Sequence, residues 1–276
     1  MSYDPVPAIT EADAAGEVAE IFADIRNTLG VNVVNLVWRH IATFPGALAW
    51  TWATLRPIYA SGAAGLQAKR LKTELVKPAL SVWPTAVLRC VQVDAASEVI
   101  IRRILASYNQ SNPLNLVALT TLVRHIDGMP FSASGSSVAA VSSSEPDMMG
   151  TLPKLLALDE VTLDTADLIL KINMLADRHQ GRIVASMYRH LAHWPGFLAL
   201  SYAQLAPLAA DGSISKMVES AVTLADNASC HLQSGLATLP RPENVSAIRQ
   251  ASKDFIDQAI SKMVPIAMLI NASLTK

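Results

Sequence analysis

The sequence predicts an all-α protein built from two tandem helical repeats. Three observations support this prediction. Apolar residues recur at helical spacings, runs of alternating β-branched residues are scarce, and one phrase occurs twice, as WRHIATFPG at 38–46 and YRHLAHWPG at 188–196. We expect the two copies to be related by a pseudo-twofold axis, with a site in the cleft between them.

The duplication extends well beyond this phrase. Between 38–62 and 188–212, twelve of twenty-five positions are identical at a constant offset of 150. The segment 128–150 is rich in Ser and Gly and has no helical pattern, which is typical of a linker. We therefore expect a first helical repeat over 1–127 and a second over 151–276, joined by this linker.

Each repeat opens with an amphipathic helix. The segment AGEVAEIFADIRNTLG (15–30) spaces its apolar residues by three and four, and TADLILKINMLADRH (165–179) does the same. The FPG and WPG steps further along predict turns, because Pro fits the first turn of a helix and restricts the residue before it.

Each repeat closes with a long helical segment that contains a proline. The first segment predicts two helices broken at Asn112–Pro113, and the second predicts a similar break at Val264–Pro265. The reason in both cases is that Pro removes a backbone donor and clashes with the preceding turn.

Composition limits the classes of function. Hydrophobic residues make up 51% of the chain and charged residues 16%, and the net charge is -1, so we expect a large core and no nucleic-acid partner. The uncharged run 104–123 contains Asn and Pro, which disfavour a membrane span. The N-terminus carries acids where a signal peptide carries bases, which predicts a cytoplasmic protein. Cys90 and Cys230 form no CxxC pair and are expected to be small buried residues.

The histidines and arginines do not favour a metal site. His190 and His193 lack the Glu of an HExxH motif, so we expect helix-end histidines bonded to backbone carbonyls. Arg39 and Arg189 could each bind a carboxylate substrate, but because they occur in both copies we expect them to be structural. The sequence contains no phosphate-binding loop and no nucleophile motif, so we expect neither a metal nor a cofactor.

Asn112 is the leading site candidate from the residues alone. An Asn before Pro at a helix break exposes an amide that can hold a small carboxylate or a water. The same residue could instead cap the following helix, with Pro113 at its first position. Trp50 differs from its counterpart Leu200 in the second copy and is a candidate for the lining of the cleft.

Three segments, taken in order, resemble the D,L-2-haloacid dehalogenases of the DehI type, which hydrolyse both enantiomers. They are IRNTLGVNVVNLVWRHIATFPG, LASYNQSNPLNLVALTTL and LADRHQGRIVASMYRHLAHWPG. The resemblance covers most of the chain. It implies a cofactor-free mechanism in which an Asp in the cleft activates water, and the water displaces halide from C2 with inversion.

The chain departs from this family at several positions. The position of the family's Asp is occupied by Met187, whose thioether cannot accept a proton, and loss of a general base costs about 10²- to 10⁴-fold in rate. The family's Asn before Pro matches Asn112. A Thr and a Glu of the family correspond to Ser61 and Gly65, and an apolar position appears as Asn35.

Two acids are candidates to replace the missing base. Asp177 resembles an additional Asp of the family and is expected to be structural. Asp211 occupies the place that Ser61 has in the first copy, across the expected cleft, although an Asp-Gly step is also a common turn.

Two functional hypotheses follow. The first is a cofactor-free enzyme of altered chemistry that acts on a small carboxylated molecule in the cleft, because the resemblance is to enzymes. The second is a non-catalytic binding or sensing protein in which Met187 packs against the ligand or closes the cavity. A third reading is a collapsed cleft and a role in oligomerisation, for example as a homodimer. The catalytic candidates are Asn112 and Asp211, and the substrate-binding candidates are Asn35, Ser61, Ser186, Met187 and Trp50.

Overall fold

The computed structural model describes residues 6–130, 150–177 and 182–274. Within these ranges the regular structure is helical, apart from an isolated bridge between Trp83 and Leu274. The all-α prediction is therefore confirmed. The α-helices are, in chain order, α1 (Gly16–Leu29), α2 (Leu36–Ile41), α3 (Ala47–Ala60), α4 (Ala63–Glu74), α5 (Thr85–Cys90), α6 (Ala95–Ile126), α7 (Leu163–Asn173), α8 (Ser186–Leu191), α9 (Pro195–Ala210), α10 (Ser213–Leu232), α11 (Val245–Phe255) and α12 (Ser261–Ala272).

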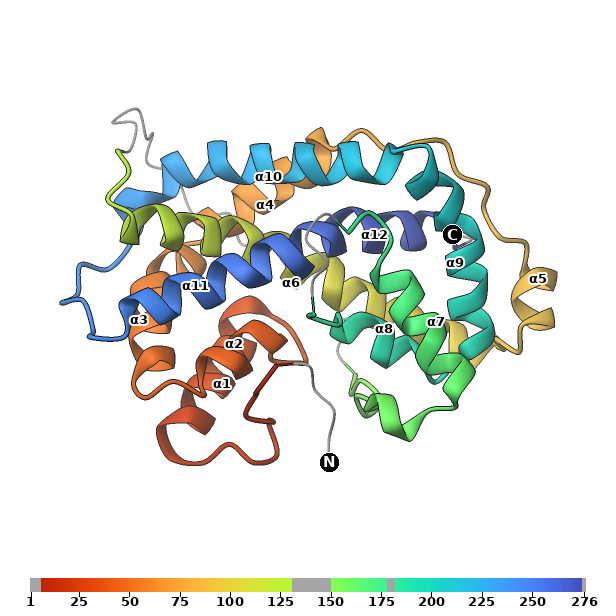
Figure 1. The fold of residues 1–276 in the computed structure, drawn as a ribbon, viewed down its shortest axis with the longest axis horizontal. Helices are drawn as coiled ribbons and strands as arrows, with labels where there is room; N and C mark the ends of the chain where they lie inside the picture. The colour runs from red at the N-terminus through yellow and green to blue at the C-terminus, as the bar shows by residue number, and fades with distance from the viewer. Residues whose placement is uncertain (1–5, 131–149, 178–181, 275–276) are drawn as a thin grey trace.

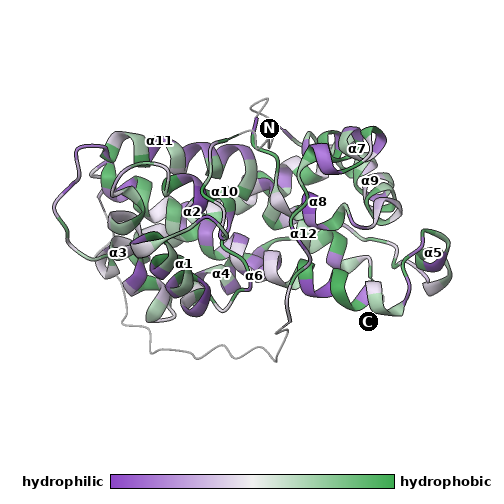
Figure 2. Cartoon of the chain, turned by 90° about the horizontal axis from the view of Figure 1, so that it is seen from below, coloured by the Kyte–Doolittle hydropathy of each residue, from purple (hydrophilic) through white to green (hydrophobic). Residues whose placement is uncertain are grey.

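Helix α6 forms the centre of the fold and contacts α4, α10, α11 and α12 along its 32 residues (Figure 1). Both overall views place α1 and α3 at one end of the molecule and α7 and α9 at the other (Figure 1, Figure 2). Hydrophobic and hydrophilic bands alternate along most helices in Figure 2, as expected of helices that bury one face. The middle of α6 therefore lies between the two ends of the molecule.

The predicted break at Asn112–Pro113 is wrong, because α6 runs through both residues. Pro113 has no N–H, so the carbonyl of Asn109 loses its intrahelical donor, and a Pro inside a helix costs about 3 kcal/mol. Leu116 and Leu119, which follow the proline, are fully buried. Burial of each such side chain stabilises the fold by about 1.5–3 kcal/mol, which outweighs the lost bond.

The C-terminal segment also differs from its prediction. Its irregularity is a π-helical turn at Ile256–Ile260 between α11 and α12, whereas Pro265 lies inside α12. The N–H of Ser261 donates to the carbonyl of Ile256 and closes this turn. A π turn accommodates one extra residue in the helix, and such turns are frequent at functional sites.

Two hydrophobic cores share α6, and each draws residues from both halves of the sequence. The first core combines α1 to α4 with Leu116–Ile126 of α6 and with α11. The second core combines α7 to α9 with the first part of α6 and with α12. The segment from α11 to α12 therefore passes from one core to the other, as α6 does.

Several helix bounds recur at the offset of 150. Helices α2 and α8 begin and end at equivalent positions. Helices α4 and α10 also begin at equivalent positions. Gly62 and Gly212 cap these last two helices with φ of 75° and 79°, where another residue costs about 1–2 kcal/mol, which accounts for Gly in both copies. The pseudo-twofold axis stays a prediction, and residues 131–149 of the expected linker lie outside the described residues.

Two further expectations concern the surface. Cys90 is exposed and Cys230 is half-buried, so the expectation of two buried thiols is wrong. Cys90 lies on α5 and Cys230 on α10. None of the helices in the described part of the chain combines the length and hydrophobicity that crossing a bilayer requires.

Candidate functional site

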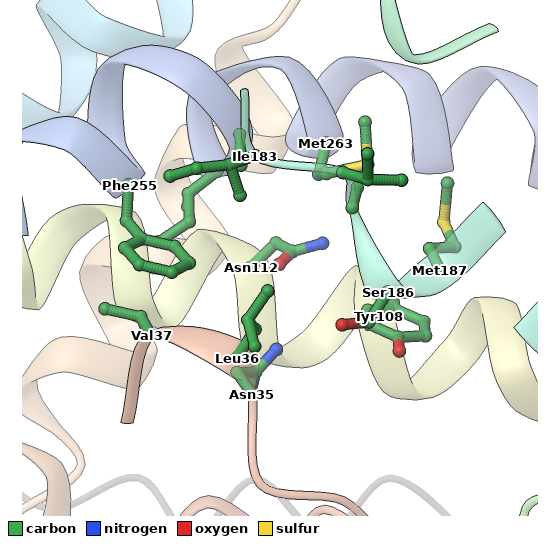
Figure 3. Close-up of a pocket in the computed structure, with 14 residues that line it drawn as sticks. Asn35, Leu36, Val37, Tyr108, Asn112, Ile183, Ser186, Met187, Phe255 and Met263 are labelled. Carbon is green, nitrogen blue, oxygen red and sulfur yellow. The ribbon is translucent and has the colours of Figure 1, made fainter. Parts of the chain in front are cut away.

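A pocket lies where the two cores meet (Figure 3). Its volume is about 40 Å³. The walls come from the start of α2, the middle of α6, the start of α8 and the π-helical region before α12. The lining residues are Asn35, Leu36, Val37, Tyr108, Asn112, Ile183, Val184, Ala185, Ser186, Met187, Phe255, Ala259, Ile260 and Met263.

The starts of α2 and α8 face this pocket with equivalent residues. The lining positions 35–37 of the first repeat and 185–187 of the second are related by the offset of 150. Asn35 therefore corresponds to Ala185, and Val37 corresponds to Met187. The pocket combines equivalent positions from each half of the chain.

Helix α6 contributes Tyr108 and Asn112, which lie four residues apart and therefore on one face of the helix. The sequence analysis identified Asn112 and missed Tyr108. The signal that could have found Tyr108 was its helical spacing from Asn112 within YNQSNP. The amide of Asn112 does not cap a helix, since the residue lies inside α6.

Three polar atoms around the pocket have no hydrogen-bond partner among the described residues. They are Asn35 Oδ1, Asn112 Nδ2 and Ser186 Oγ, and their residues are 9%, 5% and 9% exposed. The other end of the Asn35 amide donates to Ser111 Oγ at 3.0 Å, which fixes its orientation. Buried polar atoms without partners cost about 1–3 kcal/mol each, so the pocket is prepared for a polar ligand or water.

Tyr108 lines the pocket and hydrogen-bonds to a residue behind it. Its hydroxyl lies 2.8 Å from Nδ1 of His190, and both side chains are buried. Burial raises the pKa of Tyr108 above its usual value and lowers the pKa of His190 to about 3, with the nearby charges of His193, Arg189 and Arg39 acting in the same direction on His190. Both groups are therefore uncharged near neutral pH.

Met187 is fully buried and lines the pocket beside Ser186 (Figure 3). Its thioether is a weak acceptor and does not titrate. No Asp, Glu or His belongs to the pocket lining in the described ranges. The polar chemistry of the pocket is therefore that of amides and hydroxyls.

Three of the predicted site residues do not line this pocket. Asp211 ends α9, and its Oδ1 accepts from the N–H of Ser213 at 2.8 Å in an exposed turn. Ser61 occupies the equivalent turn after α3. Trp50 donates from Nε1 to the carbonyl of Pro240 at 2.9 Å. The pocket brings together Asn35, Asn112, Ser186 and Met187 and leaves these three outside.

Several basic residues contact backbone carbonyls, as expected. Nε of Arg189 donates to the carbonyl of Leu156 at 2.6 Å. His193 and His40 contact the carbonyls of Lys154 and Pro7 at 2.8 and 2.7 Å, respectively. Across the described residues, no group of three or more His, Cys, Asp or Glu side chains is arranged to hold a metal ion.

A larger, open cavity of about 1140 Å³ lies beyond His190. Arg39, Arg189 and His190 line it, together with residues from the N-terminal segment and from 150–160. Tyr108 faces the small pocket while its partner His190 faces this cavity. The hydrogen-bonded pair therefore separates the two spaces.

A buried ion pair supports one wall of the pocket. Lys262 donates to the backbone carbonyl of Asn173 at 2.9 Å and lies 3.5 Å from Oδ1 of Asp177. The side chain of Asn173 accepts from the N–H of Ala185 and donates to the carbonyl of Ile183, both at 3.1 Å. Burial lowers the pKa of Lys262, and Asp177 opposes this effect. The cluster fixes the position of the wall segment 183–185.

Comparison with known proteins agrees with this fold. A D-2-haloacid dehalogenase mutant in complex with D-2-CPA superposes with a TM-score of 0.75 over 100% of this chain and 98% of that chain, at 16% identity. A D-2-haloacid dehalogenase in complex with L-LA gives a TM-score of 0.68 over 99% and 97% of the two chains, also at 16% identity. The fold is therefore that of the D-2-haloacid dehalogenases.

Sequence comparison points to the same class. A configuration-inverting 2-haloacid dehalogenase from Alcaligenes xylosoxydans xylosoxydans is 27% identical over 211 residues, which are 74% of this chain and 69% of that protein. No family model matches the chain. The resemblance to the haloacid dehalogenases that the sequence predicted is confirmed.

Proposed function

We propose that this chain binds a small compound with a carboxyl-type head group, either an acid or its amide, in the pocket between Asn35, Asn112 and Ser186. The observation that carries the proposal is the convergence of three unpartnered polar atoms on a small and otherwise apolar cavity. Apolar walls with a few placed polar groups are the usual composition of a small-molecule site. The solved relatives in complex with D-2-CPA and L-LA support a ligand of this size.

The pocket is proposed to bind this ligand without the hydrolytic step of the haloacid dehalogenases. That step requires a base beside the reacting carbon, and Met187 occupies the position that the resemblance gives to the base. The described lining offers no other carboxylate or imidazole. Tyr108 and His190 do not replace the base. Burial raises the pKa of Tyr108, which keeps its proton, and lowers the pKa of His190 to about 3, which makes its imidazole a weak proton acceptor.

A cofactor-free enzyme of altered chemistry is the second candidate. It is favoured by the relatives, which are hydrolases, and by the amides and hydroxyl that surround the pocket. Such an enzyme would work with Asn35, Asn112 and Ser186, since Asp211 lies in a turn outside the pocket. The two candidates differ in whether the bound compound is recovered unchanged.

The test uses both enantiomers of 2-chloropropionate and of 2-chloropropionamide as ligands. We expect at least one to raise the melting temperature of the wild-type protein and to be recovered unchanged, as followed by NMR. Asn35→Ala and Asn112→Ala should each weaken binding about tenfold or more, because each removes a polar group that meets the ligand. Ser61→Ala, in an exposed turn outside the pocket, is the control and should bind as the wild type does.

Three outcomes separate the readings. Unchanged affinity in both Asn variants would reject this pocket as the site. Conversion of the ligand by the wild type, lost in the Asn variants, would establish the enzyme instead of the binding protein. Absence of any binding by the folded wild type would reject the proposed function.

A further inference from the structure

The hydrogen bond between Tyr108 and His190 determines what the pocket offers to a ligand. The Tyr108 hydroxyl is 2.8 Å from His190 Nδ1, and a further polar contact of the imidazole is with the backbone carbonyl of Pro153. A carbonyl only accepts, so the ring nitrogen on that side carries the proton and Nδ1 is the acceptor. Tyr108 therefore donates its proton to His190.

This assignment is supported by the surroundings of the pair. His190 is 2% exposed, and burial lowers its pKa to about 3, so the ring stays neutral and holds a single proton. The opposite tautomer would point a lone pair of the ring at the Pro153 carbonyl, which is unfavourable. The charged groups around Tyr108 are Arg39, Arg189 and Glu11, and all three line the larger cavity beyond the pair.

With its proton committed, Tyr108 presents only oxygen lone pairs to the pocket. Asn35 Oδ1 is a second acceptor without a partner in the described chain, while Asn112 Nδ2 is a donor without one. The Ser186 hydroxyl lies close to that of Tyr108 and can rotate to donate to a ligand or to accept from it. The pocket therefore requires a ligand head group that both donates and accepts hydrogen bonds.

We infer that Tyr108 is a specificity-determining residue that selects a small primary carboxamide over the corresponding carboxylate. The amide N–H groups would donate to Tyr108 and Asn35, and the amide oxygen would accept from Asn112. A carboxylate has acceptors only, so its oxygens would face those of Tyr108 and Asn35 with no proton between them. The flexible side chains of Met187 and Met263 allow the apolar part of the cavity to adapt to the ligand.

The inference rests on the proposed function and names the ligand class of that same pocket. It is tested by calorimetric titration of the full-length protein with propionamide and with propionate near neutral pH. We expect propionamide to bind at least tenfold more tightly. Tyr108→Phe should weaken propionamide binding about tenfold and should not weaken propionate binding, because only the amide loses a partner.

Two further variants separate specificity from folding. Tyr59→Phe is the matched control: Tyr59 is also buried and hydrogen-bonds to Asn115 Oδ1 at 3.1 Å, but it lies outside the pocket. It should keep the wild-type preference. His190→Phe removes the acceptor and frees the Tyr108 proton to face the pocket, so the ratio of amide to carboxylate affinity should fall about tenfold.

The results that overturn the inference differ from those that overturn the proposed function. Tighter binding of propionate than of propionamide by the wild type would reject the carboxamide and leave the pocket a binding site. An amide preference that survives both Tyr108→Phe and His190→Phe would reject the role of Tyr108. Failure of both probes to bind would count against the proposed function itself, and the inference would fall with it.

Discussion

Val37 and Met187 occupy equivalent positions in the two halves of the chain and line the same pocket from the first turns of α2 and α8. Both side chains are apolar and buried, with exposures of 2% and 0%. The pocket therefore has an apolar residue at each of the two positions where the pseudo-symmetry would allow a carboxylate. An Asp introduced at Val37 can therefore serve as the control for an Asp introduced at Met187.

We expect the wild-type protein to release no halide from either enantiomer of 2-chloropropionate, and Met187→Asp to release it. An Asp at this position would accept a proton from water, and a positioned general base contributes about 10²- to 10⁴-fold in rate. Ion chromatography of released chloride measures the difference. Val37→Asp places the same charge in the same pocket from the opposite helix and should stay inactive. Equal release by both variants would contradict the assignment of the base position to Met187.

The stability of the protein should depend on the protonation of His190. The unfolded residue takes up a proton near its ordinary pKa of 6.5, whereas in the folded protein its pKa is lowered to about 3. Between these values the unfolded state binds more protons, so the free energy of unfolding falls as the pH drops from 6.5 toward 3. The fall reaches about 1.4 kcal/mol per pH unit. Above pH 6.5 His190 is neutral in both states, so the free energy of unfolding shows no loss from this residue.

Urea unfolding at several pH values measures this slope in the wild type and in His190→Gln. The variant cannot titrate at this position, so its free energy of unfolding should depend less on pH between 3 and 6.5. Parallel slopes for the two proteins would show that His190 is accessible to protons in the folded state.

The buried pair of Lys262 and Asp177 should couple strongly. Their side chains are 2% and 0% exposed, and removal of one partner from a buried pair costs about 3–5 kcal/mol. We expect Lys262→Met to destabilise the protein by this amount and the double variant with Asp177→Leu to recover part of the loss. A double-mutant cycle of urea unfolding should give a coupling energy of about 1 kcal/mol or more.

The control for this cycle is the exposed pair of Lys171 and Asp167, which lie 2.6 Å apart with 58% and 59% of their side chains exposed. An exposed pair at this helical spacing contributes about 0.3–0.5 kcal/mol. A coupling energy for Lys262 and Asp177 no larger than that of the control pair would contradict the role of the buried cluster.

Substitution by alanine should change the stability of the protein in opposite directions at two glycines, one that caps α4 and one inside it. Gly62 caps α4 with φ of 75°, so Gly62→Ala should destabilise the protein by about 1–2 kcal/mol. Gly65 lies inside α4 with open space where a Cβ would be added, so Gly65→Ala should stabilise the protein by about 0.5–1 kcal/mol. Chemical denaturation of both variants against the wild type measures the two shifts. Loss of stability in both, or in neither, would contradict the conformational explanation of the glycine in both copies.

The sequence predicted the helical class because its apolar spacing is a local property, and it predicted part of the pocket because Asn35, Asn112, Ser186 and Met187 fall in segments that resemble the dehalogenases. It failed at Pro113, where the local rule predicts a break. Tertiary burial of residues such as Leu116 decides the outcome there, and burial depends on contacts far apart in the chain. Tyr108 precedes this position, and only the packing around the pocket reveals that it lines the site.

Asp211 lies outside this pocket, and the reason is different. The repeat placed it opposite Ser61, and the expectation of a cleft there assumed that equivalent turns face each other. In the structure each turn simply joins two helices, α3 to α4 and α9 to α10. Sequence equivalence identified positions with the same local conformation, whereas the pocket depends on where the ends of α2 and α8 meet.

Because each hydrophobic core contains helices from both halves of the sequence, a chain cut between 130 and 150 would yield two polypeptides that each lack part of both cores. Neither piece should fold by itself, yet the two should reassemble when mixed, as halves of a split reporter do. The pocket would form only on reassembly, since α2 and α8 arrive on different pieces. Ligand binding would then report association of the fragments.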